Sequence, residues 1–190
     1  LFGIGLESYT VGSYDFYLGY GAKKGKIVTL DTGHFHLTES IADKISSMLL
    51  FTPEIMLHVS RPIRWDSDHV VILNDDLQDL AREIIRCDAL DRVHIGLDYF
   101  DATINRIGAY VIGCRATQKA FIQALLEPSA LLNSYEENGQ YFERLALQEE
   151  LKSMPWQAVW DYYCILNDVP VGENYISEIQ KYEQTVTSKR

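Results

Sequence analysis

Cysteine, basic residues and long apolar runs are all scarce in this 190-residue chain. Its cysteines are Cys87, Cys114 and Cys164, and three thiols at such wide spacing provide neither a disulfide framework nor a zinc-binding pattern. We therefore expect reduced thiols in the core of a cytoplasmic protein. No apolar run approaches the roughly 18 residues that a membrane-spanning helix needs, so we expect no membrane partner.

The low content of basic side chains narrows the range of partners. Lysine and arginine number 17 against 27 aspartates and glutamates, which gives a formal net charge of −10. A protein that binds duplex nucleic acid or an anionic membrane surface normally presents a basic face, so both partners are disfavoured. The surplus of carboxylates suits a cation instead, and this directs attention to metal binding.

Strand-like and helix-like segments alternate over the first two thirds of the chain. The predicted strands are residues 26–31, 55–60 and 93–98, and the predicted helices are 38–50, 75–89 and 104–126. Thr38 is the expected N-cap of the first helix. Such alternation predicts parallel βαβ units in an α/β protein. The spacing fits a (β/α)₈ barrel whose other strands precede Leu1, or else an open sheet.

The last third of the sequence has no strand signal. Glycines and prolines separate helices predicted at residues 129–138, 140–153, 156–167 and 174–188. Most of the tryptophan and many tyrosine side chains of the chain lie in this region. We expect them to pack these helices against the rest of the fold or against another subunit.

The candidate metal ligands lie within, at or just after the predicted strands. They are Asp31, His34, His58, Asp66, Asp68 and Asp98. Because the carboxyl ends of parallel strands converge on one face of a barrel, these side chains should approach a common centre. Carboxylates crowded in this way repel one another, and one or two divalent cations remove that cost. Mixed aspartate and histidine ligands suit Mn²⁺, Mg²⁺, Co²⁺ or Zn²⁺.

Each of these motifs also has an ordinary structural interpretation. Asp-x-x-His is common in capped loops, Asp-x-Asp is often a solvated pair, and a histidine inside an apolar strand is usually hydrogen-bonded in the core. His36 and His69 are equally consistent with partners of the ligands and with loop residues. His94 lies near the amino end of its strand and is expected to be structural, and Glu7 is expected to be a hydrogen-bonding loop residue.

Five long segments resemble the carboxyl-terminal part of the L-rhamnose isomerase family: LFGIGLESYTVGS, LDTGHFHLTE, LHVSRPIRWDSDHVV, DRVHIGLDYFDATINR and MPWQAVWDYYC. The resemblance covers essentially all 190 residues. It implies the last β/α units of a (β/α)₈ TIM barrel at residues 1–126 and a helical extension at 127–190, which packs on the barrel or on a neighbouring subunit. It also implies a cytoplasmic homotetramer that acts on a small sugar.

The resemblance divides the candidate ligands between two sites, typically occupied by Mn²⁺, with Zn²⁺, Co²⁺ or Mg²⁺ as alternatives. The structural metal is matched by Asp31, His58 and Asp98 together with an upstream glutamate, and the catalytic metal by His34, Asp66 and Asp68. The implied reaction is the interconversion of L-rhamnose and L-rhamnulose by a metal-assisted 1,2-hydride shift, as in an intramolecular oxidoreductase. Asp98, or a metal-bound water beside it, would move the proton. Phe100 is expected either to form a wall for the apolar edge of a deoxy sugar or to pack in the core.

Residues 1–5 form an apolar stretch with turn glycines, which suggests that the chain begins inside a fold. In the family pattern the bridging glutamate and an active-site lysine precede the position of Leu1, so we expect this chain to be inactive without the preceding half. Three alternatives remain open. They are another sugar isomerase or epimerase on the same barrel, a metal-dependent phosphodiesterase, which the negative charge disfavours, and a non-catalytic fragment.

Overall fold

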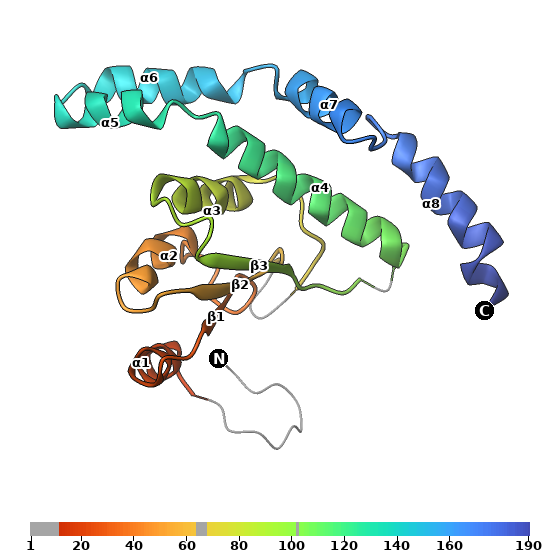
Figure 1. Ribbon diagram of the computed structural model, residues 1–190, viewed down its shortest axis with the longest axis horizontal. Helices are drawn as coiled ribbons and strands as arrows, with labels where there is room; N and C mark the ends of the chain where they lie inside the picture. The colour runs from red at the N-terminus through yellow and green to blue at the C-terminus, as the bar shows by residue number, and fades with distance from the viewer. Residues whose placement is uncertain (1–11, 64–67, 102) are drawn as a thin grey trace. The chain divides into compact units, whose positions relative to one another are not determined.

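The computed structural model describes residues 12–63, 68–101 and 103–190 (Figure 1). The chain divides into two compact units, Leu1–Phe121 and Ile122–Arg190, and the boundary falls within one long helix, α4 (Arg106–Leu125). The first unit is mixed α/β and the second is helical. Two of the residues considered above, Glu7 and Asp66, lie outside the described residues.

The first unit is built on a three-stranded parallel sheet in the order β1–β2–β3. The strands are β1 (Val28–Asp31), β2 (Ile55–Val59) and β3 (Val93–Leu97). This confirms the predicted parallel α/β alternation, with strands one or two residues shorter than the sequence indicated. The register pairs Asp31 with His58 and His58 with Gly96. Paired residues of neighbouring strands point to the same face, so the carboxyl ends of β1 and β2 present their side chains together.

Helices α2 (Ala42–Leu49) and α3 (Asp75–Arg86) connect the strands and contact each other. Each helix buries an apolar stripe in the core. The buried members include Ile45, Met48, Leu49, Leu77, Leu80 and Ile84. They share the core with Leu30, Ile55 and Leu57 of the sheet, which are at most 1% exposed. Burying a side chain of this size stabilises the fold by roughly 1.5–3 kcal/mol, and this core holds the strand ends in register.

The predicted cap of α2 is wrong. The helix begins at Ala42, with Ile41 at the N-cap position and no side-chain cap bond. The Thr38 hydroxyl instead lies 2.7 Å from Nδ1 of His36, in the turn that precedes the helix. Short hydroxyl side chains often bond to local partners in turns, and that competing bond removes Thr38 from the helix start.

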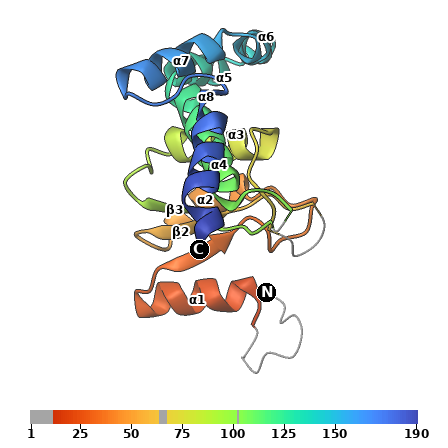
Figure 2. The same ribbon diagram turned by 90° about the vertical axis from the view of Figure 1, so that its right-hand side faces the viewer.

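One helix, α1 (Tyr14–Lys24), was not predicted from the sequence. The Ser13 hydroxyl accepts a hydrogen bond from Phe16 N at its start, and Gly25 ends it with a left-handed backbone. Two glycines and four aromatics in the segment obscure the helical period. Gly21 has a packing reason, because a β-carbon there would collide with the Val28 side chain. The helix lies on the side of β1 away from β2 (Figures 1 and 2).

The connection from β3 to α4 is anchored by one buried tyrosine. The Tyr99 hydroxyl donates a hydrogen bond to the Ala109 carbonyl oxygen at 2.9 Å, and its ring stacks on Tyr110 with centroids 5.0 Å apart. Burial, followed by the nearby Cys114 and Tyr110, raises the pKa of Tyr99 to about 12, so the phenol remains a donor at neutral pH. The residue immediately before this anchor is Asp98.

The second unit contains α5 (Ser129–Glu137), α6 (Tyr141–Lys152), α7 (Trp156–Leu166), α8 (Asn174–Thr185) and a short 3₁₀ turn (Thr187–Lys189). The four predicted helices are confirmed. Helices α5 and α6 contact each other, and Leu132, Trp160 and Cys164 are buried. The expectation of three core thiols is confirmed for the buried Cys164, but Cys87 is only half-buried and Cys114 on α4 is exposed. Among the described residues, no helix is long and apolar enough to cross a membrane.

Candidate metal centre

The first group of candidate ligands joins the carboxyl ends of all three strands. Nδ1 of His58 lies 3.3 Å from Oδ2 of Asp31 and 3.1 Å from Oδ2 of Asp98. The strand position beside His58 is Gly96, which has no side chain, and Asp98 is the next residue on the same face. A β-carbon at Gly96 would lie 2.8 Å from the terminal methyl group of Met56, so the glycine accommodates that side chain. The three ligand atoms lie within 4.8 Å of one another.

The second group uses the loops that follow β1 and β2. Nε2 of His34 lies 3.8 Å from Oδ2 of Asp31 and 3.6 Å from Oδ2 of Asp68. Its ligand atoms also lie within 4.8 Å of one another. Asp31 therefore belongs to both groups, with Oδ2 facing His58 on one side and His34 on the other. The sequence pattern had predicted that these side chains converge, but not that one carboxylate is shared.

Asp31 is held in a fixed orientation. Its other oxygen, Oδ1, accepts a hydrogen bond from Gly33 N at 2.9 Å, and the residue is 8% exposed. Burial raises the pKa of the Asp31 carboxyl, and the charge of Asp68 acts in the same direction. The Gly33 bond and the imidazoles of His34 and His58 oppose this rise without cancelling it. A buried carboxylate with a raised pKa is one that a cation would stabilise.

The raised pKa of Asp31 predicts a pH-dependent effect in metal-free protein. Below the ordinary pKa of 3.8, Asp31 is neutral in both the folded and the unfolded chain. As the pH rises, the unfolded chain loses its proton first, so the wild type loses stability up to and through the raised folded-state pKa. The variant Asp31→Asn has no carboxyl group at this position, so it does not lose stability in this way. Thermal unfolding in EDTA should show the melting temperature of Asp31→Asn rising relative to that of the wild type as the pH increases above about 4. The prediction would be contradicted if the melting temperature of Asp31→Asn fell relative to that of the wild type as the pH rose.

The ligand atoms of the two groups suit a divalent cation that prefers oxygen and nitrogen ligands. Each group combines two carboxylates with one imidazole and contains no thiolate. Such ligands suit Mn²⁺, Mg²⁺, Co²⁺ or Zn²⁺, whereas Cu⁺ and iron–sulfur clusters favour thiolate ligands. The residues present could therefore hold a metal in either group.

The other candidates fall outside the two groups. His36 is bonded to Thr38, and His69 exchanges backbone hydrogen bonds with Arg61. Nε2 of His94 lies 2.6 Å from Oε2 of Glu54, at the amino end of the sheet. Phe100 does not pack in the core, because its side chain is 68% exposed. It remains a candidate wall for a ligand.

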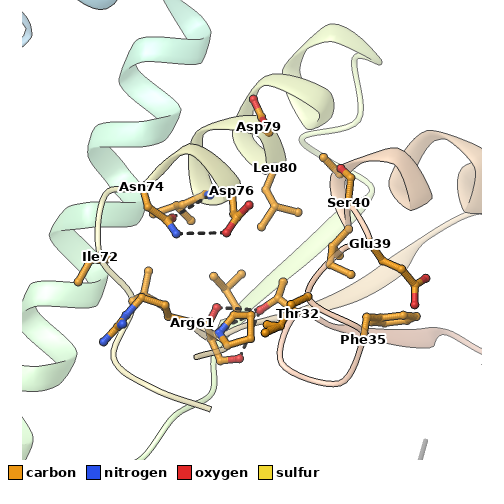
Figure 3. A pocket seen from close by; sticks show the side chains of 18 of the residues that line it. Thr32, Phe35, Glu39, Ser40, Arg61, Ile72, Asn74, Asp76, Asp79 and Leu80 are labelled. Atoms are coloured by element: carbon orange, nitrogen blue, oxygen red, sulfur yellow. Dashed lines mark hydrogen bonds between the residues drawn. The ribbon is translucent and has the colours of Figure 1, made fainter. Parts of the chain in front are cut away.

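Two cavities flank the strand ends. One of about 310 Å³ lies next to Asp31 and His34 and is also lined by Tyr14, Tyr17 and Lys44. The other, of about 90 Å³, is lined by the loops before α2 and α3 and by residues that follow β1 and β2 (Figure 3). The larger cavity gives access to the ligand groups from the side of α1.

Two buried hydroxyl-bearing residues beside the candidate ligands were not predicted from the sequence. Thr32 and Ser60 directly follow β1 and β2, are buried, and bond to each other across the sheet. The only signal in the sequence was the turn pattern Asp-Thr-Gly, in which an aspartate commonly accepts a bond from the amide two residues later. A lone serine after a strand gives no comparable signal.

Fold and site together define the class. This is an α/β protein in which aspartate and histidine groups, able to hold divalent metals, gather at the carboxyl ends of parallel strands. The family model for L-rhamnose isomerase (RhaA) matches residues 1–190. The chain belongs to the L-rhamnose isomerase family.

Individual relatives agree with this family. The chain is 70% identical over all 190 residues to an L-rhamnose isomerase of Bacteroides thetaiotaomicron, covering 46% of that protein. It is 59% identical to one of an Enterobacter species and 57% identical to one of Escherichia coli, covering 45% of each. The chain spans about half the length of the curated relatives it matches, and that half is their carboxyl-terminal part. The resemblance found in the sequence is thereby confirmed.

Proposed function

We propose that the chain supplies the metal-binding half of an aldose–ketose isomerase that interconverts L-rhamnose and L-rhamnulose by a 1,2-hydride shift. One observation carries the proposal. In a chain of this family, Asp31 is shared by two Asp/His groups at the strand ends, which is a suitable layout for two neighbouring cations. The wider assembly belongs to the same proposal: a barrel end at residues 1–126, a helical extension at 127–190, and a cytoplasmic homotetramer.

We assign the residues as follows. Asp31, His58 and Asp98 would hold a structural metal, and His34 and Asp68, with Asp66, would hold a catalytic one. When bound, divalent cations supply Lewis acidity that polarises the sugar carbonyl and favours ionisation of the neighbouring hydroxyl, and Mn²⁺ is the proposed ion. Asp31 orients both histidines, because its fixed carboxylate faces Nδ1 of one and Nε2 of the other.

Two exposed side chains complete the proposed site. The Asp98 side chain is 59% exposed, and its Oδ2 lies 3.1 Å from His58. That carboxylate can accept a proton from one sugar hydroxyl and return it to the adjacent oxygen, the transfer that an aldose–ketose conversion requires. Phe100 follows two residues later and presents an apolar surface suited to the methyl group of a deoxy sugar.

An activity assay on a restored protein tests the function. We would join this chain to the preceding part of the Bacteroides thetaiotaomicron relative, with which it shares 70% identity. The hybrid should convert L-rhamnose to L-rhamnulose with Mn²⁺, and EDTA should abolish the reaction. The 190-residue chain alone should show no turnover. The ketose product can be measured colorimetrically or by chromatography.

Control assays distinguish an error in the assigned substrate from an error in the assigned reaction. A panel of other aldoses, assayed in parallel, should react more slowly than L-rhamnose. Faster conversion of a different sugar would contradict the assignment of L-rhamnose as substrate, but the protein would still be an aldose–ketose isomerase. A folded hybrid that binds Mn²⁺ but converts no aldose would contradict the reaction itself, and turnover by the 190-residue chain alone would contradict the need for the preceding part.

A further inference from the structure

A short hydrogen-bond chain connects the ends of β1 and β2 to the candidate ligand Asp68. It begins at Thr32, the first residue after β1, whose amide N donates to the His58 carbonyl at 3.0 Å and so extends the strand pairing by one step. Thr32 is 5% exposed and Ser60 is 7% exposed. Buried polar groups are almost always hydrogen-bonded in folded proteins, so each of these two side chains needs a partner inside the fold.

The hydroxyl of Thr32 holds the backbone of Ser60. It accepts a hydrogen bond from Ser60 N at 2.8 Å and donates one to the Ser60 carbonyl oxygen at 2.9 Å. Both backbone groups of Ser60 are thus satisfied by one side chain that lies 28 residues earlier in the sequence. The Ser60 hydroxyl lies 3.3 Å from the Thr32 hydroxyl and has a second, shorter contact with Asp68.

The hydroxyl of Ser60 donates to Oδ1 of Asp68 at 2.7 Å. An ionised carboxylate can only accept, so the serine must be the donor, and the length is that of a charge-assisted bond. The other oxygen, Oδ2, then faces Nε2 of His34 at 3.6 Å. A pair of backbone bonds joins Arg61 and His69, which are the chain neighbours of Ser60 and Asp68, and so holds Asp68 beside Ser60.

We propose that Ser60 is a positioning residue that holds one oxygen of Asp68 so that the other is directed at the metal position shared with His34 and Asp31. The inference rests on the proposed function, because it takes Asp68 as a metal ligand. Without the Ser60 bond the Asp68 side chain, which is 34% exposed, is free to rotate towards solvent. Outer partners that fix a ligand in this way typically contribute about 10–100-fold to metal affinity.

The test measures Mn²⁺ affinity and metal-free stability in the 190-residue chain. Ser60→Ala should weaken Mn²⁺ binding by about 10–100-fold in a chelator competition. Ser60→Thr keeps the hydroxyl, and Ser60 lines a cavity of about 90 Å³. It should restore binding to within about threefold of the wild type.

A matched control separates positioning from folding. Ser47→Ala removes another serine hydroxyl, which bonds to the Asp43 carbonyl on the exposed side of α2. It should leave Mn²⁺ affinity unchanged, and the metal-free melting temperature of Ser60→Ala should fall no further than that of this control. A purely structural role for Ser60 would lower the metal-free melting temperature and leave affinity unchanged.

Three outcomes overturn the inference. They are wild-type Mn²⁺ affinity in Ser60→Ala, equal weakening in Ser60→Ala and Ser60→Thr, and a wild-type chain that binds no Mn²⁺. The proposed function is judged separately, by L-rhamnose turnover in the hybrid protein. If the hybrid is inactive on rhamnose while Mn²⁺ affinity still depends on Ser60, the inference stands and the substrate assignment fails.

Discussion

Replacing Asp31 by asparagine is expected to abolish high-affinity Mn²⁺ binding at both ligand groups. The amide oxygen can still accept the bond from Gly33 N, so the local turn should survive. What is lost is the negative charge that faces His34 and His58 and that both groups share. Removing a metal ligand lowers metal affinity more than removing a partner that orients the ligand, so we expect Mn²⁺ affinity to fall by about 100-fold or more. Isomerase activity of the hybrid should fall by a similar factor or more at limiting Mn²⁺.

Isothermal titration with Mn²⁺ would measure this directly, and the chain offers a matched control. Asp91 is exposed and lies just before β3, at the opposite end of the sheet from the ligand groups. Asp91→Asn removes the same charge and should titrate like the wild type. If Asp31→Asn retains one Mn²⁺ of full affinity, the shared role of Asp31 is wrong.

Replacing Gly113 by alanine is expected to destabilise the first unit. A β-carbon at this position would overlap the Tyr99 hydroxyl and press on the carbon that bears it. Relief requires moving either α4 or the buried ring, and overpacking of this kind costs about 1–3 kcal/mol. For a chain of this length the melting temperature should fall by roughly 2–4 °C per kcal/mol. Since Tyr99 directly follows Asp98, we also expect weaker Mn²⁺ binding at the group containing Asp98.

The same helix contains the control for this prediction. A β-carbon at Gly108 would come no closer than 3.6 Å to any neighbour, so Gly108→Ala should be neutral or stabilise the chain by up to about 1 kcal/mol. Adding Tyr99→Phe removes the clashing hydroxyl, although it also removes the bond to Ala109. Gly113→Ala should therefore cost less in the Tyr99→Phe background. Equal costs in both backgrounds would show that the Tyr99 contact is not the cause.

Much of the first unit could be predicted from the sequence because its signals are local. Short β-branched runs alternate with amphipathic stripes, and the stripes of α2 and α3 are buried where the period places them. The sequence did not predict the local structure correctly where residues favouring different conformations lie in the same segment. The glycines and aromatics of α1 concealed a helix that Ser13 caps, and the Thr38 hydroxyl bonds within a turn instead of capping α2. The exposure of Cys114 depends on how a largely apolar helix packs, which composition does not determine.

The sequence by itself determined which residues are candidate metal ligands and that Asp31, His58 and Asp98 lie on one face at the strand ends. Side chains alternate along a strand and parallel strands end on the same side, so residue spacing is sufficient for that conclusion. Only the tertiary structure decided that Asp31 faces both histidines and that Ser60 holds Asp68. Those contacts depend on the register between β1 and β2 and on the backbone bonds between Arg61 and His69. Both are set by packing and hydrogen bonds between residues far apart in the chain, which no local pattern specifies.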